Sequence, residues 1–138
     1  MNDLAPADGS PSDGSPSDVA VMAANAAYAK GGLDPVIIDV APILGICDVF
    51  VVVTATNDRQ VKAITDHVQA ELADRFGRRP RSIEGTDARR WVLLDYGDVV
   101  VHVFQTEERS TYRLERLYVD ADRIDWRTPE ERTGSASA

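Results

Sequence analysis

The stretch WVLLDYGDVVVHVFQ, residues 91–105, is the part of the 138-residue sequence that says most about the fold. Two mostly apolar runs flank a short polar segment centred on Tyr96 and Gly97. This pattern predicts two β-strands joined by a tight turn. Gly97 can supply the positive φ that such a turn needs, so the stretch is the strongest hairpin signal in the chain.

The segments upstream of this hairpin predict two strands and a long helix. PVIIDV (35–40) and CDVFVVVT (47–54) are β-branched runs, and the second is apolar on both faces, as in a buried strand. A helix follows over 56–77 and ends at a glycine. Asn57 caps this helix, and Gln60 completes the capping-box pattern three residues later.

The remaining elements complete the order of the fold. The alanine-rich segment 19–32 predicts a first helix with Asp18 as its N-cap. A basic turn leads into a short strand within 78–85, and 106–118 indicates a short or broken helix. Hairpins combined with a strand–helix–strand crossover predict an α/β (α+β) fold, with a mixed five-stranded sheet and flanking helices.

The length predicts one domain between two tails. Residues 1–18 are acidic, contain a tandem DGSPS repeat and are expected to be disordered. Residues 19–122 form the expected folded domain, and 123–138 the expected flexible C-terminal tail. The N-terminus lacks the pattern of a secretory signal, and no apolar run reaches the roughly 20 residues needed to span a bilayer, so we expect a cytoplasmic protein.

The net charge of −8 restricts the classes of partner. DNA, RNA backbone and anionic membranes all require clustered Lys and Arg, which an acidic chain does not favour. A basic protein suits it better.

The hairpin first suggests an acid–base site made of Asp95, Asp98 and His102. Four residues of strand separate Asp98 from His102 by about 13 Å, and no Ser or Cys nucleophile lies in the hairpin. His67 and His102 are too far apart in sequence for a metal motif, and Cys47 is the only cysteine. We therefore expect no catalytic residue, no metal and no cofactor.

A protein-binding hairpin explains the same residues better. Trp91 and Tyr96 are residue types that often dominate the binding energy of interfaces. Core packing is an equal alternative for Trp91, and Asp95 and Asp98 also have the pattern of ordinary turn residues.

Several blocks of the sequence, in this order, resemble the ribosomal silencing factor (Iojap) family. They are DPVIIDV, CDVFVVVTATNDRQVKAI, EG (84–85), WVLLDYGDVVVHVF and RSTYRLERLYVDA. The resemblance covers roughly residues 19–124, and WVLLDYGDVVVHVF is its most specific part.

This resemblance implies a fold related to nucleotidyltransferases and binding to the large ribosomal subunit through the basic ribosomal protein L-fourteen. A protein bound there would block joining with the small subunit and repress translation during starvation or stationary phase. The family is not known for catalysis. Carried over by position, the resemblance implies a partner-binding set of Trp91, Leu94, Asp95 and Tyr96, with Asp98 and Glu84 as neighbours. Trp91 and Leu94 alternate faces in a regular strand, so which of them faces the partner stays open.

The sequence departs from nucleotidyltransferases where their chemistry would require a match. Its Gly-Ser pairs lie in the tails, and its one D-x-D, at 120–122, follows the last helix. These departures argue against nucleotidyl transfer, so a nucleotidyltransferase-like enzyme or nucleotide-binding protein is kept only as the alternative. A further alternative is a homodimer that hides the hairpin.

Overall fold

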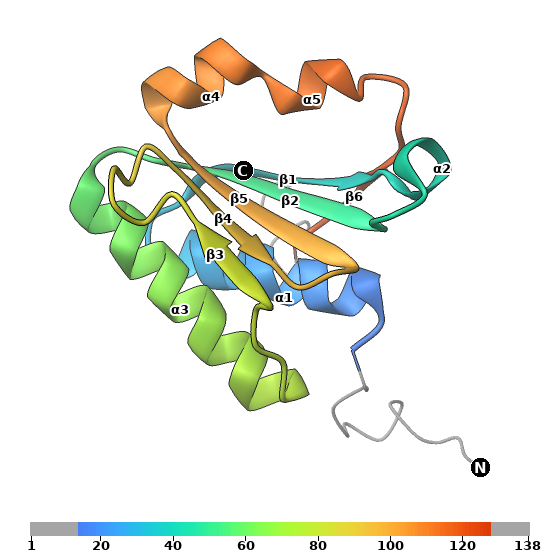
Figure 1. Cartoon of the computed structure of the whole chain (residues 1–138), viewed down its shortest axis with the longest axis horizontal. Helices are drawn as coiled ribbons and strands as arrows, with labels where there is room; N and C mark the ends of the chain where they lie inside the picture. Colours follow the sequence, from blue (N-terminus) through green and yellow to red (C-terminus); the bar gives the residue numbers. More distant parts are fainter. Residues whose placement is uncertain (1–13, 128–138) are drawn as a thin grey trace, which may run out of the picture.

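A six-stranded mixed sheet forms the centre of the protein, shown in Figure 1. The structure is a computed structural model, and it describes residues 14–127. The strands are β1 (Leu33–Asp39), β2 (Val49–Ala55), β3 (Ser82–Glu84), β4 (Trp91–Asp95), β5 (Val99–Gln105) and β6 (Arg123–Ile124). Their spatial order is β3-β4-β5-β2-β1-β6; β2 and β5 are parallel, and every other pair is antiparallel. The predicted mixed sheet is confirmed, with the short β6 as an added strand.

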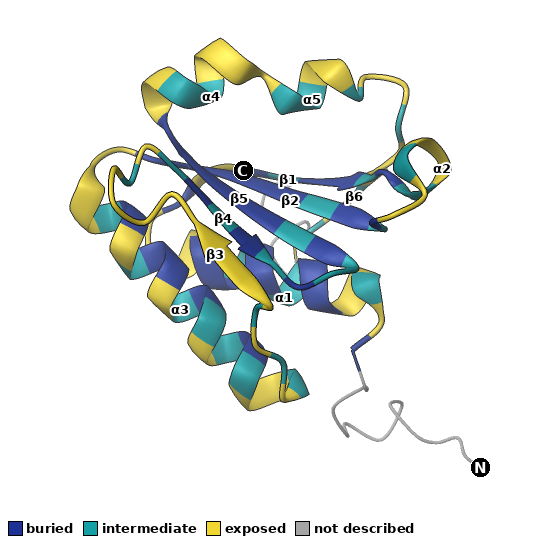
Figure 2. Ribbon diagram, viewed as in Figure 1, coloured by how far each residue is buried: buried dark blue, intermediate teal, exposed yellow. Residues whose placement is uncertain are grey.

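The helices lie on both sides of the sheet. They are α1 (Pro16–Ala29), α2 (Ala41–Leu44), α3 (Asp58–Phe76), α4 (Thr106–Tyr112) and α5 (Leu114–Leu117). α1 and α3 pack on one face, called here the α1–α3 face, and α4 and α5 lie over the other, the α4–α5 face (Figure 1). Figure 2 shows the buried residues concentrated in the sheet and on the sides of α1 and α3 that face it.

Strand alternation divides the core into two clusters. On the α1–α3 face, alternate β-strand residues such as Val51 and Val101 pack against Ile64 and Leu72 of α3. The opposite face carries a smaller cluster that includes Phe104. Complete burial of a Val, Leu or Ile side chain contributes about 1.5–3 kcal/mol, so the larger cluster provides most of the hydrophobic stabilisation.

The predicted caps of the long helix are confirmed. The Asn57 side chain accepts a hydrogen bond from the Gln60 backbone N–H at 2.8 Å, and Gly77 ends α3 with φ 64°. The Gln60 side chain accepts a hydrogen bond from the backbone N–H of Thr56 at 2.7 Å. The reciprocal bond of the capping box therefore reaches one residue further back than the usual pattern.

The first helix begins before the predicted start. Ser15, and not Asp18, is the N-cap, and its hydroxyl accepts a hydrogen bond from the Asp18 backbone N–H at 3.2 Å. Pro16 occupies the first helical position, where its missing N–H costs nothing. The tail predicted for 1–18 is therefore helical at its end, and residues 1–13 lie outside the described residues.

The segment after residue 122 also differs from its prediction as a flexible tail. Ile124 of β6 pairs with Ile37 of β1, and the Asn25 side chain donates a hydrogen bond to the Trp126 carbonyl at 2.7 Å. The Trp126 ring packs against Tyr28, with their centroids 4.9 Å apart. Residues 123–127 are thus held against the domain, and the rest of the predicted tail lies outside the described residues.

Candidate functional site

The predicted hairpin is formed by β4 and β5. Its turn is closed by a hydrogen bond from the Tyr96 N–H to the Val99 carbonyl at 2.9 Å. The Asp95 carboxylate accepts from the Gly97 N–H at 2.8 Å, an Asx turn, and Gly97 has φ 93°. The need for glycine at this position is confirmed.

The six predicted partner-binding residues lie in different environments. Leu94 is completely buried and Tyr96 nearly so, both on the α1–α3 face. Trp91 and Asp95 alternate to the other face and are partly exposed. Leu94 offers no exposed surface in this structure, because helices α1 and α3 cover its face of the sheet.

Trp91 is the member of the Trp91–Leu94 pair that lies on the partly open face. Its ring packs against Phe104 and Tyr112, with centroids 4.7 Å away in each case. Its indole N–H donates a hydrogen bond to Nδ1 of His102 at 3.1 Å. Trp91 therefore packs between the sheet and helix α4, and the rest of its side chain is partly exposed.

His102 is a buried, neutral histidine. Desolvation by burial lowers the pKa of His102 to about 4. Because Nδ1 accepts from Trp91, the ring proton is on Nε2. Nε2 is buried and has no hydrogen-bond partner within residues 14–127.

Asp98 at the hairpin turn is held by an arginine of the same chain. Arg78, which follows α3, contacts both carboxylate oxygens of Asp98, at 2.6 and 3.2 Å. It also donates to the Tyr96 carbonyl at 2.9 Å, and the hydrogen bond to Asp98 raises the pKa of Arg78. Asp98 is therefore directed to Arg78 and His102 to Trp91, and the two do not form an acid–base pair.

The other two predicted carboxylates differ in how far the chain neutralises them. Asp95 lies 3.3 Å from Nε of Arg81. Glu84 is exposed on β3, beside Leu93 of β4, and forms no ion pair within the described part of the chain. Glu84 is thus the predicted site residue whose charge is most open to a partner.

A cavity of about 230 Å³ lies on the α4–α5 face beside the hairpin and is called here the hairpin-face cavity. Its lining comes from α2 and the loop after it, β2, β3, β4 and β5. The lining residues used below are Ile46, Phe50, Arg81, Glu84, Leu93, Asp95, Val100 and His102. Ile46 is 86% exposed, an unusual exposure for an isoleucine. Ile46 and Phe50 were not among the predicted site residues. Ile46 ends the apolar connector APILGI (41–46), which was a signal for it, whereas Phe50 lies inside the apolar run of β2.

Cys47 also lines this cavity, but its role is structural. Its thiol donates to the Asp98 carbonyl at 3.4 Å, which ties the loop after α2 to the hairpin turn. Burial raises the pKa of the Cys47 thiol, so its reactive thiolate form is disfavoured.

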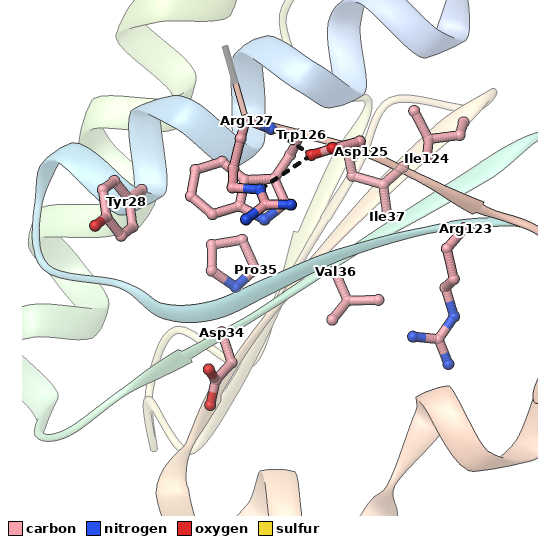
Figure 3. Close-up of a pocket in the computed structure, with 10 residues that line it drawn as sticks. All are labelled: Tyr28, Asp34, Pro35, Val36, Ile37, Arg123, Ile124, Asp125, Trp126 and Arg127. Atoms are coloured by element: carbon pink, nitrogen blue, oxygen red, sulfur yellow. Dashed lines mark hydrogen bonds and ion pairs between the residues drawn. The ribbon is translucent and has the colours of Figure 1, made fainter. Parts of the chain in front are cut away.

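A larger cavity, of about 480 Å³, lies at the β1–β6 edge of the sheet and is shown in Figure 3. The side chains of Tyr28, Pro35 and Trp126 line it, and Arg127 at its rim is paired with Asp125 at 3.3 Å. None of the predicted site residues lines this cavity.

Residues 14–127 contain neither a cluster of metal-binding side chains nor a membrane-spanning helix. These residues contain no group of three or more His, Cys, Asp or Glu arranged to hold a metal ion. None of their helices is both long and apolar enough to cross a membrane.

Comparisons with known proteins agree with the fold and place the chain in a family. A family model described as "Ribosomal silencing factor during starvation" matches residues 13–138. The ribosomal silencing factor RsfS of Bacillus subtilis is 41% identical over 104 residues, which cover 75% of this chain and 87% of that protein. A crystal structure of a Chromobacterium violaceum protein has a TM-score of 0.72 at 31% identity and covers 76% of this chain and 87% of its own.

A mouse protein named "Mitochondrial assembly of ribosomal large subunit protein 1" is 33% identical over 88 residues, which are 62% of this chain and 38% of that protein. With the family model and the bacterial relatives, these matches confirm the resemblance seen in the sequence. The chain belongs to the ribosomal silencing factor (Iojap) family.

Proposed function

We propose that this protein binds the large ribosomal subunit through the basic ribosomal protein L-fourteen and blocks joining with the small subunit, which lowers translation when nutrients are scarce. The names of the relatives support a role in ribosome silencing. The mouse relative is named for assembly of the large subunit, which favours that subunit as the target.

The observation that carries the proposal is the surface around the hairpin-face cavity. Ile46 is strongly exposed beside the partly exposed Phe50 and Leu93, and Glu84 has no cation of its own in the described residues. An apolar patch with a polar rim is typical of protein interfaces. The acidic rim fits a basic protein and would repel the phosphates of ribosomal RNA.

We propose a narrower contact set than the one that the resemblance implied, supported by the burial and pairing of its residues. Trp91, Asp95 and Glu84 stay in the proposed contact set because they reach the α4–α5 face. Leu94 and Tyr96 support the hairpin from the buried side, and Asp98, paired with Arg78, fixes its turn.

Silencing by this surface requires occupation and no chemistry. Apolar side chains buried at the centre of an interface supply most of the affinity, and Glu84 helps to set the orientation through a partner cation. Once bound, the bulk of the domain would exclude the small subunit from the same area.

The proposal is tested by co-sedimentation with purified large subunits. We expect Ile46→Asp to weaken binding by at least about tenfold, because a carboxylate would have to be desolvated at an apolar contact. Glu84→Lys should weaken binding less at high salt than at low salt, because exposed charges are screened.

Two variants serve as matched controls for this experiment. Leu33→Asp makes the same kind of change on a half-exposed apolar residue of β1 that pairs with Thr54 at the far end of the sheet. Asp74→Lys repeats the charge reversal on an exposed site of α3, on the α1–α3 side of the sheet. If both hairpin-face variants co-sediment as well as their controls, this surface is not the binding site.

A further inference from the structure

One polar atom in the proposed docking surface has no structural explanation within the domain. Nε2 of His102 carries the ring proton, is buried and makes no hydrogen bond within residues 14–127. A buried donor left unpaired destabilises a protein by about 1–3 kcal/mol, so a partner that supplies an acceptor for it would be favoured.

The neighbours of His102 explain why the domain itself provides no acceptor. The ring of Phe50 meets the imidazole edge-on at 4.6 Å, and Trp91 uses the opposite nitrogen. Leu93 lies directly across on β4. His102 lines the hairpin-face cavity, so a segment that fills the cavity packs against its imidazole, and a small movement of the rings that cover Nε2 would let an acceptor reach that atom.

The charges around the cavity restrict the chemistry of this acceptor. Three charged residues line it: Arg81, Glu84 and Asp95. Arg81 lies 3.3 Å from Asp95, which leaves Glu84 as the uncompensated charge. A carboxylate or phosphate would be repelled by Glu84, and a cation cannot accept a hydrogen bond. A neutral oxygen satisfies both conditions, and the backbone carbonyl is the neutral acceptor that every residue of a protein segment carries.

We infer that His102 donates a hydrogen bond from Nε2 to a carbonyl oxygen of the protein segment that fills the hairpin-face cavity. This inference rests on the proposed function, and the segment is one of the basic ribosomal partner. It presents an apolar side chain to Phe50, Leu93 and Val100, a carbonyl oxygen to His102 and a lysine or arginine to Glu84. His102 thereby selects for a peptide backbone or side-chain amide at the cavity.

Two substitutions separate this role from a purely structural one. His102→Asn keeps an acceptor near the position of Nδ1 for Trp91 and loses the donor at Nε2. His102→Gln can place an amide N–H near Nε2 and loses the acceptor at the Nδ1 position. Binding of each variant to purified large subunits is measured by co-sedimentation across a concentration series, with thermal unfolding as the check of folding.

We expect His102→Asn to bind about tenfold more weakly than the wild type, the effect of losing one buried hydrogen bond at an interface. His102→Gln should recover most of that loss. If Gln binds more weakly than Asn, or if both bind like the wild type, the inference is overturned while the proposed function stands. If the wild type does not bind large subunits, the proposed function fails, and the inference fails with it.

A measurement on the wild-type chain keeps the inference testable if the variants do not fold. Imidazole ¹H–¹⁵N NMR of the free protein should find the His102 proton on Nε2. On addition of L-fourteen, that proton should move downfield and exchange more slowly with water. A proton on Nδ1 in the free chain, or an Nε2 proton unaffected by bound L-fourteen, would contradict it.

Discussion

At the scale of single residues, His102 shows how burial decides the role of a titratable group. In the sequence, its spacing from Asp98 argued against an acid–base pair, and the structure gives the two residues separate partners. The imidazole is enclosed by aromatic rings and bound to the Trp91 indole. It is therefore a fixed neutral donor, and its protonation should be coupled to unfolding.

We predict that protonation of His102 weakens the fold under mild acid. Its pKa is lowered to about 4 in the folded protein, against an ordinary value of 6.5, so the unfolded chain binds the proton more readily. Stability from this group is complete above pH 6.5 and declines by up to about 3 kcal/mol as the pH falls to 4.

Urea unfolding at several pH values measures this effect. The difference in free energy of unfolding between the wild type and His102→Phe isolates the histidine from the carboxylates that also titrate there. The free energy of unfolding of the wild type should therefore fall relative to that of His102→Phe as the pH falls from 6.5 to 4. A constant difference over this range would show that His102 is not buried in its neutral form.

At the scale of elements, the hairpin depends on contacts from outside its own sequence. Arg78 reaches from the loop after α3 to clamp the turn at Asp98 and Tyr96. Gly85, after β3, has φ 85°, and a Cβ there would collide with the backbone carbonyl of Trp91. The edge strand β3 and the turn are therefore positioned by two residues that precede the hairpin.

We predict that Arg78→Lys lowers the free energy of unfolding by about 1–3 kcal/mol. Lysine cannot reproduce the two-pronged contact with Asp98, and both partners are less than one-third exposed. Lys62→Ala is the control, because its pair with Asp66 is more than half exposed and should contribute less than about 0.5 kcal/mol. Chemical denaturation of both variants measures the contrast, and equal effects would contradict the clamp.

The elements that the sequence predicted are those with local signals. The hairpin has its Gly97 turn, and α3 has Asn57 and Gly77 as caps, so both could be read from neighbouring residues. β6 has only two residues, and its pairing with β1 depends on a contact across more than 80 positions. No local pattern carries that information.

The candidate site was predictable only in part for the same reason. Strand alternation separated Trp91 from Leu94, but only the packing of α1 and α3 shows which face is covered. The Arg78–Asp98 pair joins residues 20 positions apart, and Ile46 reaches the site through the order of the strands. The sequence predicts each segment separately. The site depends on how these segments pack against one another, which only the tertiary structure shows.

At the scale of the whole molecule, the sheet gives the protein one well-covered face and one partly open face. The open face carries the hairpin-face cavity, and the family relationship gives the protein a ribosomal context. That the protein is not an enzyme stays a prediction, which calorimetry with magnesium and each nucleoside triphosphate would test. A homodimer that hides the same face stays an alternative free state, and light scattering over a concentration series would detect it.

The central claim is that occupation of the large subunit by this face prevents subunit joining. Purified small and large subunits are mixed at a magnesium concentration that favours association and are separated on a sucrose gradient. The account predicts that excess wild-type protein shifts associated ribosomes to free subunits and is itself found with the large subunit, whereas Ile46→Asp leaves association unchanged. Wild-type protein bound to large subunits with no loss of associated ribosomes would contradict the claim.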